Sequence, residues 1–263
     1  MAYPDGMRES VRGAWARAVR FSGAWRATAE AWLDALPVDC LLCRARAHAG
    51  GLCPDCLAEV TASMRGERQR CAVCSLPLDG LETCPDCAAV PPAFDRVMAA
   101  FDYVFPGDLL VHQLKNARRF ACARSLSGIL ARRIREDPVG LPRHTILVPV
   151  PASRASIRKR GFNPAAEIGR ALARRLGLRC RPALLQRARE GARQASLSRV
   201  ERIRNAQGLY ACAGRVDGCD IAVVDDVLTT GSTAHGIARA FRNAGARSVC
   251  VLVLARTRHH FSS

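Results

Sequence analysis

Long apolar runs and aromatic residues are both scarce in this chain of 263 residues. No segment approaches the ~20 consecutive apolar residues that a transmembrane helix needs, so we expect no membrane span. The first residues lack a basic stretch followed by an apolar one, so we expect no secretory signal and a cytoplasmic protein. Aromatic residues make up only 5% of the chain, which leaves few rings on which nucleic-acid bases could stack.

Lysine is nearly absent as well, because Lys115 and Lys159 are the only lysines among 40 basic residues. The net charge of +17 comes entirely from the part of the chain after residue 92, where 30 basic residues outnumber 12 acidic ones. A positive field attracts phosphates and polynucleotides. Arginines spread over solvated helix faces would give the same composition, so the charge alone leaves both explanations open.

Eight of the thirteen cysteines form four C-x-x-C pairs, and the pattern of the first two pairs recurs 31 positions later. A two-residue spacer lets two thiolates face one ion, and two such knuckles complete a tetrahedral zinc site. Without a secretory signal, paired cysteines bind metal more often than they form disulfides. We therefore predict two structural zinc ions, with the ligands Cys40, Cys43, Cys53 and Cys56 in the first repeat and Cys71, Cys74, Cys84 and Cys87 in the second.

The pairing of the knuckles stays open at this point, because the two repeats could also exchange pairs. One intact site beside a degenerate one is a further alternative. Four thiolates leave no open coordination position, so the predicted role is stability or docking rather than catalysis.

Three regions follow from these patterns. Apolar residues recur at helical spacing between residues 8 and 36, which predicts a helical leader over 1–36. The cysteine repeats define a double zinc ribbon over 37–92. Strand-like runs alternate with amphipathic helices over 93–263, which predicts an α/β domain with a mainly parallel sheet flanked by helices.

Within the α/β region the expected strands are 97–104, 145–150, 207–213, 220–225 and 248–254, and the expected helices are 107–117, 121–136, 163–176 and 232–244. The helix at 163–176 has the clearest limits. Asn163 is a favourable N-cap, Pro164 suits the first turn, and Gly177 follows the last turn.

The most informative segment follows the apolar strand 221–224. Asp225 and Asp226 come directly after it, and a hydroxyl-rich turn then leads into a helix. Two adjacent carboxylates can accept hydrogen bonds from vicinal hydroxyls, and backbone amides at a helix N-terminus bind a phosphate dianion. A strand followed by a hydroxyl-capped helix is the plainer interpretation. The residues expected to hold the phosphate are Thr229, Thr230, Gly231, Ser232 and Thr233.

Two basic stretches could contact further phosphates. Arg158, Lys159 and Arg160 are interpreted as a loop suited to pyrophosphate or to nucleic acid, and Arg202 lies in a polar segment that could cover a ligand. Solvated charge is the alternative for the first stretch, and the start of a plain amphipathic helix is the alternative for the second. Lys115 fits either a site-facing or a surface position.

The segment 221–233 resembles the PRPP-binding signature of the type I phosphoribosyltransferases. The resemblance implies that Asp225 and Asp226 hold the ribose hydroxyls, that 229–233 hold the 5′-phosphate, and that Mg²⁺ arrives with the pyrophosphate of PRPP. Together with the cysteine knuckles, the stretches 101–103, 147–151, 158–163 and 194–205 make the chain over about 37–256 resemble the ComF family.

This resemblance implies a protein that binds PRPP or a related sugar phosphate and supports DNA uptake and natural transformation through contacts with single-stranded DNA. One alternative is an active phosphoribosyltransferase of nucleotide or cofactor metabolism, although no acceptor pocket or general base is recognisable in the sequence. Another is a zinc-dependent adaptor that docks a helicase-like competence partner.

Overall fold

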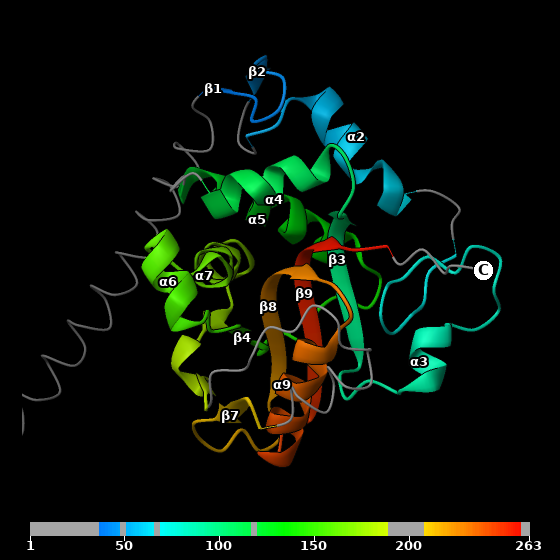
Figure 1. Cartoon of the computed structure of the whole chain (residues 1–263), viewed down its shortest axis with the longest axis vertical. Helices are drawn as coiled ribbons and strands as arrows, with labels where there is room; N and C mark the ends of the chain where they lie inside the picture. Colours follow the sequence, from blue (N-terminus) through cyan, green and yellow to red (C-terminus); the bar gives the residue numbers. More distant parts are fainter. Residues whose placement is uncertain (1–36, 48–50, 66–68, 117–119, 189–207, 259–263) are drawn as a thin grey trace, which may run out of the picture.

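The computed structural model describes residues 37–47, 51–65, 69–116, 120–188 and 208–258 (Figure 1). The predicted leader and the polar segment with Arg202 lie outside these residues. Within the described part of the chain, every helix is too short or too polar to cross a lipid bilayer.

A parallel sheet of five strands forms the centre of the molecule, in the order β3-β9-β8-β4-β5. All four strand pairs are parallel, which confirms the predicted mainly parallel sheet. The strands are β3 (Arg96–Asp102), β4 (Ile146–Pro149), β5 (Arg179–Cys180), β8 (Asp220–Leu228) and β9 (Ser248–Arg256).

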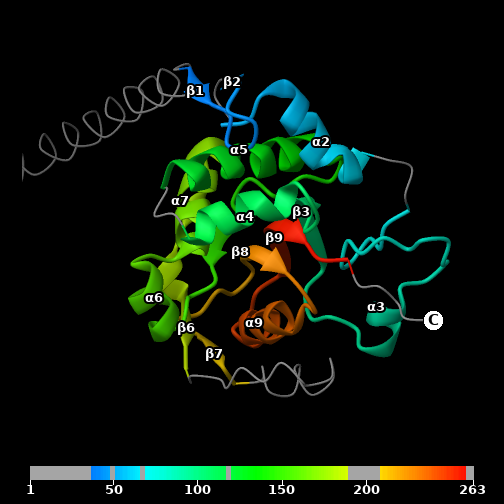
Figure 2. The ribbon, with the colours of Figure 1, turned by 45° about the horizontal axis from the view of Figure 1, so that its top comes forward.

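Helices cover both faces of the sheet, as a buried parallel sheet requires. In Figure 2, α4 (Gly107–Asn116) and α5 (Phe120–Glu136) lie above the sheet and α9 (Ser232–Asn243) lies below it. Successive strand residues point to opposite faces, so Ala222 and Val224 of β8 join the core on the α5 side, whereas Ile221 and Val223 join the core around α9.

The predicted limits of helix α7 (Pro164–Leu176) are confirmed. The Asn163 side chain accepts a hydrogen bond from the amide of Ala165 at 3.1 Å. Gly177 ends the helix with φ of 67°, a left-handed conformation that glycine adopts without steric cost.

Two expectations need correction. The run 158–160 belongs to the last turn of a helix, α6 (Arg154–Arg160), which Ser153 caps and Gly161 ends, so these residues are not in a loop. The strand expected at 207–213 is β7 (Tyr210–Cys212), and it pairs antiparallel with β6 (Leu185–Arg187) outside the central sheet. A short 3₁₀ turn, Pro182–Leu184, precedes β6.

Each cysteine repeat gathers its own four thiols, so the exchange of pairs between repeats is excluded. In both clusters all four sulfur atoms lie within 4.8 Å of one another. Zinc–sulfur bonds of about 2.3 Å in a tetrahedron place the sulfurs about 3.8 Å apart. The Sγ atoms of Cys43 and Cys53 are 3.6 Å apart, and those of Cys71 and Cys87 are 3.8 Å apart. The donor sets therefore fit two four-cysteine zinc sites.

The two repeats share the same local geometry. The first C-x-x-C turn of each is followed by a residue of positive φ, Arg44 at 66° and Ser75 at 60°, which lie 31 positions apart. The second C-x-x-C turn opens a helix at a proline, giving α2 (Pro54–Arg65) and α3 (Pro85–Ala89). The first repeat also contains a two-stranded ribbon, β1 (Val38–Asp39) with β2 (Arg46–Ala47).

The first repeat is part of the main core. Cys40, Leu52, Cys53 and Val60 are buried together with residues of α4 and α5. A Cβ added to Gly51 would lie 2.4 Å from the Ser125 hydroxyl oxygen on α5. This close approach leaves no room for a side chain at position 51.

The second repeat keeps a small core of its own and is fastened by polar contacts. Its core consists of Cys74, Leu76, Leu78 and Cys84. The amide of Val97 on β3 donates to the Val73 carbonyl oxygen at 2.8 Å. Ahead of the repeat, Arg70 pairs with the fully buried carboxylate of Asp102 at 2.8 Å, and Arg258 pairs with the same carboxylate at 2.7 Å.

Because each ion is expected to sit within one repeat, loss of one ligand should affect one ion. We predict that Cys53→Ser and Cys84→Ser, which occupy equivalent positions in the repeats, each lower the zinc content from two ions per chain to one. Zinc released by a thiol reagent from the folded variants measures this. Two ions in either variant, or none, would contradict the assignment.

Candidate ligand-binding site

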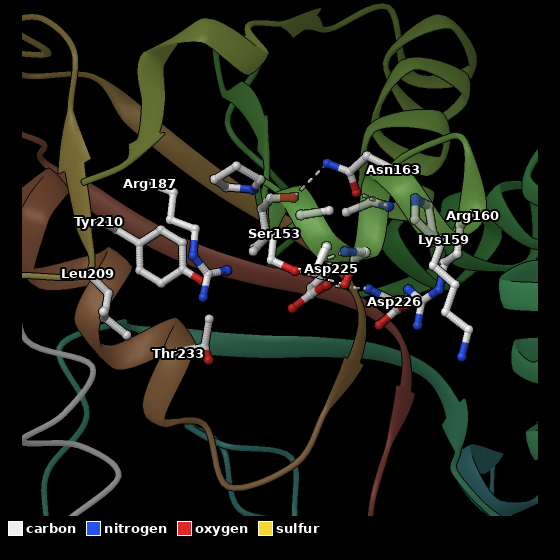
Figure 3. Close-up of a pocket in the computed structure, with 17 residues that line it drawn as sticks. Ser153, Lys159, Arg160, Asn163, Arg187, Leu209, Tyr210, Asp225, Asp226 and Thr233 are labelled. Atoms are coloured by element: carbon white, nitrogen blue, oxygen red, sulfur yellow. Dashed lines mark hydrogen bonds between the residues drawn. The ribbon is translucent and has the colours of Figure 1, made fainter. Parts of the chain in front are cut away.

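A cleft of about 630 Å³ opens beside the carboxyl ends of β4 and β8 (Figure 3). Parallel α/β sheets bind ligands at this edge, where strands lead into helices. The lining comes from the loop after β4, from α6, from the start of α7, from β8, and from the β6–β7 pair. The cleft therefore collects residues from segments that are far apart in the sequence.

Asp225 and Asp226 lie at the centre of the cleft, and both carboxylates line it. Strand β8 continues to Leu228, so the acids belong to the strand instead of following it. The Asp225 Oδ1 atom accepts a hydrogen bond from the Asp226 amide at 2.8 Å. The acids face the cleft and not the interior of the sheet.

Lys115 on α4 faces the twin acids. Of the two positions that the sequence allowed for this residue, facing the site or lying on the surface, the structure shows the first. Its Nζ atom lies 3.2 Å from Oδ2 of Asp226, and both side chains are at least three-quarters buried. On the same helix, His112 Nε2 lies 3.2 Å from the Tyr103 hydroxyl. Burial and the charges of Asp108 and Asp226 raise the pKa of Tyr103.

The environment of Asp225 favours its protonated form. Burial, followed by the charge of Asp226, raises the pKa of the Asp225 carboxyl to about 8. The Asp226 amide and the Lys115 ammonium act in the opposite direction. A ligand that donates hydrogen bonds to this carboxyl would therefore favour its ionisation.

The turn between β8 and α9 forms a second, smaller cavity of about 50 Å³ next to Asp225. Gly231, the N-cap of α9, has φ of 76°. A residue with a side chain would be strained in this conformation. The cavity lining includes Thr229, Gly231, Ser232 and Thr233. The helix N-terminus and these hydroxyls together suit an anion.

Thr230 occupies a different position from the other predicted phosphate contacts. Its side chain is 8% exposed, and its hydroxyl lies 2.9 Å from that of Ser232. It lines neither cavity. A ligand contact at this position would therefore come from the backbone and not from the hydroxyl, which pairs with that of Ser232.

The three basic residues in the last turn of α6 separate into two groups. Lys159 and Arg160 line the cleft on the side of Asp226, as Figure 3 shows, whereas Arg158 is not part of the lining. The cations and the acids thus line the same part of a cleft that is large enough for a small molecule. Such an arrangement suits a ligand that carries both hydroxyls and phosphates.

Arg187 and Tyr210 form the opposite wall, and the sequence analysis missed both. The Arg187 guanidinium carbon lies 5.7 Å from the centroid of the Tyr210 ring. In Figure 3 both side chains project from β6 and β7 toward Asp225 and Thr233. No local motif marks them, because only the antiparallel pairing of β6 with β7 brings them to the cleft.

Comparison with known proteins adds sequence relatives to this geometry. Residues 33–88 match the family model described as a double zinc ribbon domain. The DNA utilization protein YhgH of Salmonella typhi is 35% identical over 231 residues, which cover 84% of this chain and 98% of that protein. Competence protein F of Haemophilus influenzae is 27% identical over 227 residues, which cover 82% of this chain and 96% of that protein.

Among solved structures, TT1426 from Thermus thermophilus is 18% identical, with a TM-score of 0.30, over 54% of this chain and 85% of that one. This likeness is too low to support an inference. The two relatives named above match over 98% and 96% of their own length, and they support the family assignment. With its two four-cysteine zinc sites and its mainly parallel sheet flanked by helices, the chain belongs to the ComF family, which includes the DNA utilization protein YhgH and competence protein F.

Proposed function

We propose that the protein binds PRPP or a related sugar phosphate in the cleft and supports DNA uptake through contacts with single-stranded DNA. The observation that carries the first part is the convergence of the twin acids Asp225 and Asp226, the turn 229–233 and the basic residues of α6. Each of these suits a different group of one ligand.

The positions suggest an orientation for the ligand. The 5′-phosphate would bind the amides and hydroxyls of 229–233, and the ribose hydroxyls would donate to Asp225 and Asp226. Lys159 and Arg160 would then face the pyrophosphate. Mg²⁺ would arrive with that pyrophosphate and supply positive charge beside the carboxylates, so the protein needs no metal cage of its own.

An active phosphoribosyltransferase is the second candidate function, and the wall formed by Arg187 and Tyr210 favours it. This wall lines the cleft on the side of Asp225 and Thr233. An acceptor group bound there would lie next to the sugar. The identity of such an acceptor and of a general base stays open.

The DNA contact is supported by the relatives and by charge. One relative is named for DNA utilization and another for competence. Arg158 is exposed on α6 and does not line the cleft, so we expect it to contact a phosphate backbone that passes the cleft. The low aromatic content favours backbone contacts over base stacking.

The helicase-like partner stays a prediction. The first zinc repeat is buried against α4 and α5, and the second is fastened to β3 and β9. These contacts give both repeats a structural role within the chain. A partner that docks on the repeats would have to leave these contacts in place.

Replacing the acids tests the ribose site. We predict that Asp225→Ala or Asp226→Ala weakens PRPP–Mg²⁺ binding about 10- to 100-fold, because each removes a charged hydrogen-bond acceptor. Isothermal titration calorimetry measures the affinity. Asp217→Ala, which removes a carboxylate that is 56% exposed, is the control and should leave the affinity unchanged. Equal affinities for all four proteins would rule out the ribose site.

The raised pKa of Asp225 predicts a pH dependence. Ribose hydroxyls donate to the carboxylate, so binding requires a proton to leave whenever the pH lies below the pKa of about 8. Affinity for ribose 5-phosphate should therefore rise by up to about tenfold per pH unit below 8 and level off above it. Asp226→Asn removes the neighbouring charge and should shift the rise to lower pH.

Methyl phosphate, a phosphate monoester without a diol, is the control for the ionisation of the phosphate itself, because both ligands lose their second phosphate proton over the same pH range. The ratio of the two affinities isolates the carboxyl contribution. A ratio that does not change between pH 6 and pH 9 would show that Asp225 takes no part in binding.

Salt titration tests the DNA contact. Affinity for single-stranded DNA should fall steeply with salt, and Arg158→Gln should lower the slope of log K against log[salt] by about 0.7. Arg215→Gln, which replaces an arginine that is 87% exposed and paired with Asp217, is the matched control. Binding that does not respond to salt would contradict the proposal.

A further inference from the structure

Arg256 is an unusual residue because its cationic side chain is almost completely buried. It is 1% exposed and is the largest of the fully buried side chains in the described part of the chain. Arg256 is the last residue of strand β9, and it lies in register between Asp102 of β3 and Leu228 of β8. It therefore lies at the carboxyl edge of the sheet, next to the turn that leads to α9.

The guanidinium joins two parts of the molecule. Its Nε atom donates to the carbonyl oxygen of Cys74 at 3.0 Å, within the second zinc knuckle. Its Nη1 atom donates to the carbonyl oxygen of Leu228 at 3.1 Å and to that of Thr229. One side chain thus holds a zinc ligand residue and the first two peptide groups of the turn.

These contacts fix which way the turn presents its amides. A trans peptide group is planar, and its carbonyl oxygen and its N–H point in opposite directions. With the Leu228 and Thr229 oxygens directed at Arg256, the N–H groups of Thr229 and Thr230 point away from it. The Thr257 amide also donates to the Leu228 oxygen, at 3.0 Å, and holds the first peptide group from a second side.

The other end of the link depends on the zinc knuckle. The Cys74 amide lies 3.4 Å from the Cys71 sulfur, and Ser75, which follows, has φ of 60°. An ion bound by the four thiolates would hold both C-x-x-C turns of the second repeat in place. It would thereby also fix the direction of the Cys74 carbonyl. Figure 2 shows the red end of β9 running toward this repeat.

We infer that Arg256 is a positioning residue that couples the second zinc site to the phosphate-binding turn, so that zinc and a sugar phosphate strengthen each other's binding. The inference rests on the proposed function for its ligand. The first zinc site packs among α4 and α5, away from this link, and serves as an internal comparison.

Reciprocity provides a test in the unaltered protein. If zinc in the second site strengthens ribose 5-phosphate binding by some factor, the ligand must strengthen zinc retention by the same factor. The zinc-loaded protein is exposed to a chelator and a thiol-alkylating reagent, with and without saturating ribose 5-phosphate. Mass spectrometry of peptides then reports how fast each repeat loses its protection.

We expect the ligand to slow alkylation of Cys71, Cys74, Cys84 and Cys87 about 5- to 20-fold, a usual range for coupled sites. Alkylation of the first repeat should change less than twofold. Equal slowing in both repeats would mean general stabilisation, and no slowing in either would mean no link; both results overturn the inference.

Variants test the role of Arg256 itself. Arg256→Gln should weaken ribose 5-phosphate binding about 5- to 20-fold and abolish the selective protection. Arg256→Lys keeps the charge and should restore part of both. The matched control is Arg258→Gln, whose guanidinium pairs with Asp102 instead of the turn, and it should retain the selective protection. Loss of protection in Arg258→Gln, or its survival in Arg256→Gln, contradicts the inference.

Amide exchange separates this inference from the proposed function. If the protein binds no ribose 5-phosphate, the proposed function fails, but the link is still measurable without ligand. The Thr257 amide, which donates to the Leu228 oxygen, should exchange at least fivefold faster in Arg256→Gln than in Arg258→Gln. Equal exchange in the two variants would overturn the role of Arg256 independently.

Discussion

Two neighbouring carboxylates at the end of β8 are the constraint around which the rest of the site is arranged. Burial, followed by the charge of Asp226, raises the pKa of Asp225. Lys115 on α4 compensates for the charge of Asp226, and Lys159 and Arg160 line the cleft on the Asp226 side. A ligand that offers two hydroxyls would satisfy the acids, and this is the reason for proposing a sugar phosphate instead of a simple anion.

The two zinc repeats contact the α/β domain at different places. The first repeat contacts α4, where Gln113 donates to the Leu41 carbonyl oxygen at 2.9 Å. The second reaches the turn after β8 through Arg256. Closed four-thiolate sites contribute folding free energy. In this protein, zinc binding would therefore stabilise segments that lie next to the candidate cleft, and both repeats are structural parts of the α/β fold.

Local signals in the sequence predicted much of this structure correctly. The zinc ligands follow from spacing, α7 from its caps, and β8 with its turn from a run of apolar residues followed by acids and hydroxyls. Helix α6 was missed although Ser153 and Gly161 mark its ends, because the basic residues were interpreted as a loop. Arg187 and Tyr210 could not be found, since their place depends on the pairing of β6 with β7 and not on any local pattern. The same holds for Arg256, because its partners Cys74, Leu228 and Thr229 lie 182, 28 and 27 residues away along the chain.

We propose that the turn after β8 binds a sugar's phosphate while the twin acids bind its diol. A crystal structure of the protein soaked with PRPP and Mg²⁺ would test this proposal. We expect the 5′-phosphate within hydrogen-bonding distance of the amides of 229–233, with the ribose 2′- and 3′-hydroxyls on Asp225 and Asp226. A phosphate bound elsewhere in the cleft, with the acids out of reach of the ribose, would contradict it.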